Sequence, residues 1–199
     1  MSRNFANVIS LMYDMRKGLI ISSLLILASV LFQGCGERRV IRKTMKEFTS
    51  STICLPERML QVYHGKLTDY HHLDTSLTFI EYYGPESCSS CAVSHLPEER
   101  DLFRLCDSIG HVTPLIIFSP SSENEMELIS LASKAELDFP IYIDQENCMN
   151  GQKTIPNDMR FHYFLIDRDR RPVFVGHPLK GTRLKELFVK ICEQGGVSD

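Results

Sequence analysis

The 199-residue sequence contains no tryptophan, no long run of basic residues, no internal repeat and no low-complexity tract. The formal net charge of −3 and the missing basic run argue against a nucleic-acid-binding surface. With no repeat present and a hydrophobic content of 43%, we expect one compact domain with a sizeable core and an N-terminal appendage.

The cysteines lack the spacing of a structural zinc site. Cys88 and Cys91 form a C-x-x-C pair, which supplies only half of such a site. No second close pair is formed by the other cysteines of the globular part, which are Cys54, Cys106, Cys148 and Cys192. The adjacent His71 and His72 suit a single metal ion poorly, so neither a metal nor a cofactor is predicted.

The C-x-x-C pair stands where a strand is followed by a helix. Residues 77–83 are apolar, aromatic and β-branched, as in a strand buried on both faces, and Gly84-Pro85 ends the run. A thiolate at a helix N-terminus faces unpaired N–H groups and the positive end of the helix dipole, which makes Cys88 the expected nucleophile. Cys91 lies one turn on, where we expect it to be turned inward and to close the disulfide.

The N-terminus has the pattern of a secretion signal. Arg16-Lys17 precede the apolar run 18–32, which ends at Gln33-Gly34-Cys35 and is short for a membrane span. Gly34 before Cys35 resembles the lipobox of bacterial lipoproteins, in which the cysteine is lipidated and becomes the mature N-terminus. We therefore expect residues 1–34 to be a signal peptide, with an uncleaved anchor as the alternative. Both place the globular part outside the cytoplasmic membrane.

Hydrophobic periodicity predicts alternating strands and helices after a charged segment, 37–50, that reads as a spacer or short helix. Residues 59–64 are expected to be a short edge strand, Ser122 with Glu125 a capping box, and Pro97 a kink. The expected strands are 77–83, 112–118, 140–144, 161–167 and 172–176, and the expected helices are 89–109, 123–135 and 183–192.

This order, β–CxxC–α–β–α followed by a β-hairpin and a terminal helix, resembles the thioredoxin fold. The resemblance implies an α/β protein with a central mixed sheet flanked by helices, over residues 67–199, after a lipid-anchored spacer and N-terminal extension at 35–66. The insertion FPIYIDQENC and the FLID of residues 164–167 resemble TlpA-like and redoxin-type envelope lipoproteins of the Bacteroidetes type. Such proteins keep or reset disulfides outside the cytoplasm, which implies disulfide-bearing envelope proteins or a membrane electron donor as partners.

The resemblance also implies roles for residues around the cysteines. A cis-proline usually precedes the first hairpin strand and packs against the C-x-x-C, and the alignment puts Phe161 there, with Pro156 five residues upstream. Glu81, the only acidic residue on the strand leading to the site, is either a buried proton relay or a strand residue at the sheet end. Arg160 and His162 are candidates to support the Cys88 thiolate, against ordinary surface and strand roles.

Two other functions stay open. A non-catalytic binding module or copper chaperone would use Cys88, Cys91 and a nearby histidine for a soft ion such as Cu(I). A peroxiredoxin-like peroxidase would have its cysteine seven residues after a proline, with Thr or Ser four residues after the same proline. Pro85 and Ser89 fit that pattern, but Ala92 stands at the seventh position.

Overall fold

The computed structural model describes residues 36–71, 77–151 and 154–195. The chain divides into two compact units, Met1–Lys46 and Glu47–Asp199. Residues 36–49 are helical, as expected for the charged segment. The predicted signal peptide and its lipidation site, Cys35, lie outside the described residues. Within the described ranges, no helix is long and apolar enough to cross a membrane.

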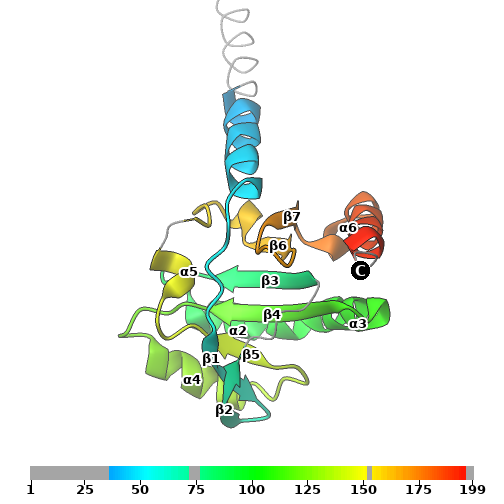
Figure 1. The fold of residues 1–199 in the computed structure, drawn as a ribbon. Helices are drawn as coiled ribbons and strands as arrows, with labels where there is room; N and C mark the ends of the chain where they lie inside the picture. The colour runs from blue at the N-terminus through cyan, green and yellow to red at the C-terminus, as the bar shows by residue number, and fades with distance from the viewer. Residues whose placement is uncertain (1–35, 72–76, 152–153, 196–199) are drawn as a thin grey trace, which may run out of the picture. The chain divides into compact units, whose positions relative to one another are not determined.

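The described strands form one mixed seven-stranded sheet in the order β2-β1-β5-β4-β3-β6-β7 (Figure 1). They are β1 Arg58–Tyr63, β2 Lys66–His71, β3 Leu77–Tyr83, β4 Val112–Phe118, β5 Ile141–Ile143, β6 Tyr163–Ile166 and β7 Pro172–Val175.

Four of these strands make the core of the thioredoxin fold. Central β3 pairs parallel with β4 on one side and antiparallel with β6 on the other, and β7 pairs antiparallel with β6. The first six residues of β3 are buried, as their apolar sequence predicted. The predicted α/β thioredoxin fold is therefore confirmed.

The sheet extends beyond this core on the β4 side. β5 is the predicted inserted strand and pairs parallel with β4. Beyond it lies β1, which was expected at an edge but has a partner on each side: Leu60 is opposite Ile143 of β5 and opposite Asp69 of β2. The edge strand is β2, which the sequence did not reveal because its residues are largely exposed and polar. The sheet thus includes β1, which lies in the predicted N-terminal extension.

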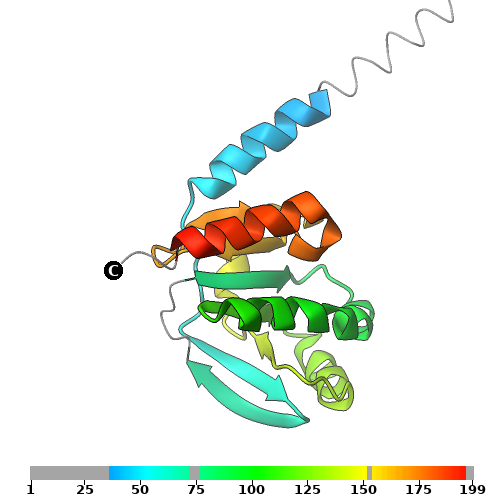
Figure 2. The same cartoon turned by 90° about the vertical axis from the view of Figure 1, so that its right-hand side faces the viewer.

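The long helices pack on one face of the sheet, where two apolar clusters form the core. One cluster joins β4 and β5 to two helices, α2 and α4, through Ala92, Val93 and Leu128. The other brings α3 and α6 against β3 and β6 through Leu102, Cys106 and Phe188, and Figure 2 shows these two helices in front of the strands. The helices are α2 Ser89–His95, α3 Arg100–Ile109, α4 Glu125–Lys134, α5 Cys148–Gly151 and α6 Thr182–Gly195.

The helix predicted at 89–109 is interrupted at Pro97, as expected. A 3-10 turn, η1 Leu96–Glu99, separates α2 from α3. The predicted capping box at Ser122 is wrong. The Asn124 N–H bonds the Ser121 carbonyl in a tight turn (3.0 Å), so α4 starts only at Glu125, with Asn124 as its N-cap and no side-chain cap.

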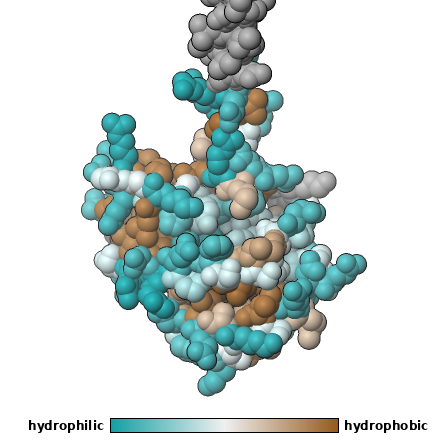
Figure 3. Space-filling model, turned by 180° about the vertical axis from the view of Figure 1, so that it is seen from behind, coloured by the Kyte–Doolittle hydropathy of each residue, from teal (hydrophilic) through white to brown (hydrophobic). Residues whose placement is uncertain are grey.

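The other face of the sheet is covered partly by the chain before β1. Phe48 packs edge-on against Phe161 and Phe164, with ring centroids 5.8 and 5.2 Å apart. Ile53 and Leu55 are almost fully buried. Seen from behind in Figure 3, hydrophobic surface occurs in separate areas interrupted by hydrophilic ones. The exposed large apolar side chains are likewise spread over different elements, for example Leu67, Met126, Val173 and Leu187.

Candidate functional site

Cys88 is the N-cap residue of α2, as the sequence predicted. Its sulfur accepts the Cys91 backbone N–H at 3.4 Å, and the two cysteines form a disulfide bond with Cα atoms 5.3 Å apart. This N–H is one of the orphan donors of the helix start, so it would stabilise a Cys88 thiolate in the reduced protein. The inward orientation expected for Cys91 is wrong, because both cysteines are exposed.

The turn before Cys88 depends on a glycine. The Ser87 N–H bonds the Gly84 carbonyl (3.0 Å) and reverses the chain directly after β3. A Cβ atom at Gly84 would lie 3.3 Å from the Tyr82 hydroxyl oxygen, so any larger residue would press against a buried side chain. Gly84 therefore lets the cysteine loop pass close to the end of its own strand.

A cavity of about 690 Å³ opens beside the two cysteines; we call it the cysteine cavity. Strand β3 contributes Tyr83, η1 contributes Glu99, β6 contributes Tyr163, and His162 precedes β6. The cavity therefore brings together segments that are far apart in the sequence.

Glu81 lies under this cavity, fully buried. It shares a strand face with Leu77 and Phe79, whose side chains pack in the cluster below α3 and α6. The hydroxyl of Tyr83 donates to its Oε1 at 2.5 Å and that of Tyr163 at 3.2 Å, while Oε2 has no hydrogen-bond partner among the described residues. Both tyrosines line the cysteine cavity, so Glu81 connects to it through hydrogen bonds.

The surroundings of Glu81 favour its protonated form. Burial, and after it the negative charge of Glu99, raise the pKa of Glu81 from the usual 4.5 to about 7. The hydrogen bonds from Tyr83 and Tyr163 act in the opposite direction, as does His177. A carboxyl group of this kind exchanges its proton near neutral pH, as an acid–base group should.

Glu99 itself is held by a histidine from beyond β7. The Nε2 of His177 lies 2.8 Å from Glu99 Oε2, and the two side chains are 8% and 12% exposed. His177 Nδ1 accepts the Leu179 backbone N–H at 3.1 Å, which assigns the ring proton to Nε2. His177 therefore donates to Glu99.

The residues predicted for the substrate side are arranged differently from expectation. Phe161 is buried against Phe48 and does not line the cysteine cavity. Pro156 follows a trans peptide bond, since the described residues contain no cis bond. It lines a neighbouring cavity of about 600 Å³, together with Tyr82 and Met149. A 3-10 turn, Met159–Phe161, occupies the predicted start of this strand, so β6 begins two residues later than predicted. The turn directs Phe161 into the core.

His162 and Arg160 have separate environments. His162 lines both cavities, and its Nε2 lies 3.0 Å from the Pro156 carbonyl oxygen, while burial lowers the pKa of its ring. Arg160 binds Asp158 through its guanidinium, with a closest contact of 2.6 Å, and does not line the cysteine cavity. Of these two candidates for supporting the thiolate, the structure brings only His162 to the cysteines.

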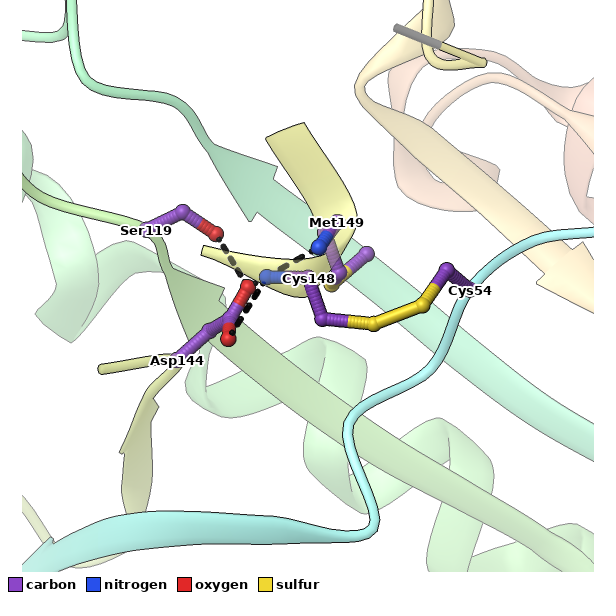
Figure 4. The surroundings of a disulfide bond; sticks show 5 residues. All are labelled: Cys54, Ser119, Asp144, Cys148 and Met149. Atoms are coloured by element: carbon purple, nitrogen blue, oxygen red, sulfur yellow. Dashed lines mark hydrogen bonds between the residues drawn. A yellow bond between two sulfur atoms is a disulfide. The ribbon is translucent and has the colours of Figure 1, made fainter. Parts of the chain in front are cut away.

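A second disulfide joins Cys54, in the chain before β1, to Cys148 at the start of α5 (Figure 4). The fully buried carboxylate of Asp144 fixes this end of α5, because it accepts the N–H groups of Cys148 (3.1 Å) and Met149 (3.0 Å). Ser119 donates a third hydrogen bond to it at 2.9 Å. The sequence did not predict this pairing.

The two remaining described cysteines, Cys106 and Cys192, are buried and free. Burial raises the pKa of Cys106 to about 12 and that of Cys192 to about 11. Both thiols therefore stay protonated at neutral pH and are poor nucleophiles.

No family model and no curated protein matches this chain. Solved structures with a similar arrangement include an uncharacterized thioredoxin-like protein from Porphyromonas gingivalis, with 13% identity and a TM-score of 0.44, covering 75% of this chain and 97% of that one. Another is the exposed lipoprotein thioredoxin Etrx1 of Streptococcus pneumoniae, with 14% identity and a TM-score of 0.44, covering 67% and 98%. A third is a putative thiol:disulfide interchange protein DsbE from Chlorobium tepidum, with 10% identity and a TM-score of 0.45, covering 71% and 96%.

Sequence reasoning found the cysteines and Glu81 but missed Tyr83, Glu99, Tyr163 and His177. A signal for one of them was present. Pairing the FLID strand with residues 77–83 in antiparallel register places Tyr163 opposite Glu81. Glu99 and His177 are 78 residues apart, and no local pattern connects them.

Proposed function

We propose that this protein is a thiol–disulfide oxidoreductase in which Cys88 attacks, Cys91 resolves and Glu81 accepts the proton of Cys91. The observation that carries the proposal is the position of Cys88 at the N-cap of α2, disulfide-bonded to Cys91 and exposed beside a cavity. The buried carboxyl group connected to that cavity supports the assignment of Glu81.

The reaction follows thiol–disulfide exchange. The Cys88 thiolate attacks one sulfur of a substrate disulfide, that bond breaks, and one substrate thiolate leaves. Cys91 then gives its proton to Glu81 and attacks the Cys88 sulfur. The second substrate thiolate leaves and takes a proton from solvent. Two electrons pass from the dithiol to the substrate, and the reverse sequence oxidises a substrate dithiol.

We further propose that the reaction takes place in the cell envelope, on a protein anchored through a lipidated Cys35. The charged and apolar pattern of residues 16–35 supports this location. The substrates would then be disulfide-bearing envelope proteins, and a membrane electron donor would reset the pair.

Insulin reduction driven by dithiothreitol tests the activity. The wild type should accelerate it, and Cys88→Ser should abolish the acceleration because the attacking sulfur is gone. The matched control is the double variant Cys54→Ser/Cys148→Ser, which removes the other disulfide and should remain active. Acceleration that survives Cys88→Ser, or none with the wild type, would exclude the proposed function.

The metal-binding alternative would use Cys88 and Cys91 together with a nearby histidine. No cluster of three or more His, Cys, Asp or Glu side chains suited to a metal ion occurs in the described part of the chain. Anaerobic titration of the reduced protein with Cu(I) tests this alternative directly, since tight stoichiometric binding would favour it.

A further inference from the structure

Two acidic side chains are connected to the cysteine cavity: Glu99 is part of its lining, and Glu81 is hydrogen-bonded to the hydroxyls of Tyr83 and Tyr163, which line it. Their environments differ. Glu81 is fully buried and receives hydrogen bonds only from tyrosine hydroxyls. Glu99 lines the cysteine cavity, keeps 12% of its side chain exposed and receives a hydrogen bond from His177. A buried carboxyl group holds its proton more tightly when a negative charge lies near it, and Glu81 is the more deeply buried of the two.

The hydrogen bonds of His177 hold the side chain of Glu99 in place. Since Nδ1 of His177 is occupied by the Leu179 N–H, the imidazole is oriented with its Nε2–H towards Glu99. The same ring lies 5.0 Å from that of Tyr163, a donor to Glu81. Tyr163 also has the Lys180 ammonium 5.4 Å from its ring centroid.

We propose that Glu99, held in place by His177, is a positioning residue of the exchange reaction: its negative charge acts on Glu81 and makes Glu81 a stronger base towards Cys91. This inference rests on the proposed function and deepens it. Burial and the negative charge of Glu99 both raise the pKa of Glu81, so a buried base without such a neighbour would have a lower pKa. No extra reactant is needed, because the proton that Glu81 takes from Cys91 is later released to solvent.

The charged and titratable groups facing Glu81 come from each element around it. They are Tyr83 on β3, Tyr163 on β6, Glu99 on η1 and His177 before the 3-10 turn Pro178–Lys180. Glu99 is the one carboxylic acid among these four groups, so its removal should have a defined direction. Without the charge of Glu99, Glu81 should be a weaker base and should ionise at lower pH.

The test measures the resolving step alone. The reduced protein is mixed with the small aromatic disulfide 5,5′-dithiobis(2-nitrobenzoate) in a stopped-flow instrument. Attack by Cys88 releases one coloured thiolate, and resolution by Cys91 releases the second. The rate of the second release is followed as a function of pH in the wild type, Glu99→Gln and Glu98→Gln.

In Glu99→Gln, the midpoint of this pH profile should move to lower pH by about one unit, and the high-pH rate should fall by about threefold. Gln is isosteric and can still accept the His177 hydrogen bond. Glu98 is the matched control, because it is the adjacent residue in the same cavity but its side chain is 75% exposed. Solvent screens its charge, so Glu98→Gln should keep the wild-type profile.

An unchanged profile in Glu99→Gln, or equal shifts in both variants, would overturn the inference. Failure of the proposed function would look different, since the wild type would then show no second release that depends on Cys91. If Glu99→Gln does not fold, carbon-13 NMR of the wild type replaces it. The Glu81 carboxyl resonance should then respond to two coupled ionisations, and a single independent titration would contradict the inference.

Discussion

Cys54 and Cys148 are joined by a disulfide bond across 94 residues of sequence. The bond ties the chain before β1 to α5, a helix of only four residues. Neighbouring residues on both sides are buried, among them Ile53, Leu55 and Met149. The disulfide therefore holds together part of the covering of the sheet face opposite α3 and α6.

Removing this bond should destabilise the fold. The double variant Cys54→Ser/Cys148→Ser should lose about 4 kcal/mol of unfolding free energy, as expected for a loop of this length. Urea denaturation monitored by circular dichroism measures the loss. The matched control is Cys88→Ser/Cys91→Ser, whose cysteines are three residues apart, and it should lose much less. Equal losses in both variants would contradict the structural role assigned to Cys54–Cys148.

The two cysteines of the C-x-x-C pair should differ in acidity although both are exposed. Cys88 is the N-cap and accepts an N–H of the first turn, whereas Cys91 lies inside the helix. Iodoacetamide at mildly acidic pH should therefore alkylate Cys88 faster than Cys91 in the reduced protein. Peptide mass spectrometry gives the ratio, and faster reaction at Cys91 would reverse the assigned roles.

Substrate trapping should show the same asymmetry. Cys91→Ser should accumulate mixed disulfides with envelope proteins, because the attacking thiol then has no resolving partner. Cys88→Ser should accumulate none. Non-reducing electrophoresis of membrane fractions reads out both variants, and equal trapping by the two would contradict the order of attack.

Stability should fall as the pH rises through neutrality, because of Glu81. Its pKa is raised to about 7 in the folded protein from 4.5, so the folded state binds the proton more tightly than the unfolded state. The associated stability is fully present below the unfolded pKa and is lost as pH rises through the folded pKa. The loss should reach about 3 kcal/mol between about pH 5 and about pH 8. Urea denaturation across this range should show a flatter dependence in Glu81→Gln, and identical slopes would exclude Glu81 as the cause.

The N-terminal prediction can be checked independently of the fold. Cys35→Ala should leave unprocessed or released protein, since several acyl chains on one cysteine are enough for stable membrane attachment. Mass spectrometry of the membrane-bound protein should find a lipidated Cys35 as the first residue. An unmodified N-terminus upstream of Cys35 in the membrane fraction would support the uncleaved anchor instead.

The sequence by itself determined the features that depend on neighbouring residues. The apolar run of β3, the break at Gly84-Pro85 and the helix after Cys88 are local patterns, and together they located the thioredoxin core and its cysteines. Pro97 likewise marked the interruption of the first helix, because a proline ring cannot continue a helical hydrogen-bond pattern.

Only the tertiary structure decided which distant residues meet. The pairing of Cys54 with Cys148 depends on how the chain before β1 crosses the sheet, and spacing along the sequence carries no record of that path. The sequence identified Glu81 as an acidic residue on a buried strand. Its pKa, however, depends also on Glu99, and Glu99 is oriented by His177 from beyond β7. Periodicity predicts elements because backbone hydrogen bonds are local, whereas the electrostatics of a site depend on elements packed together across the core.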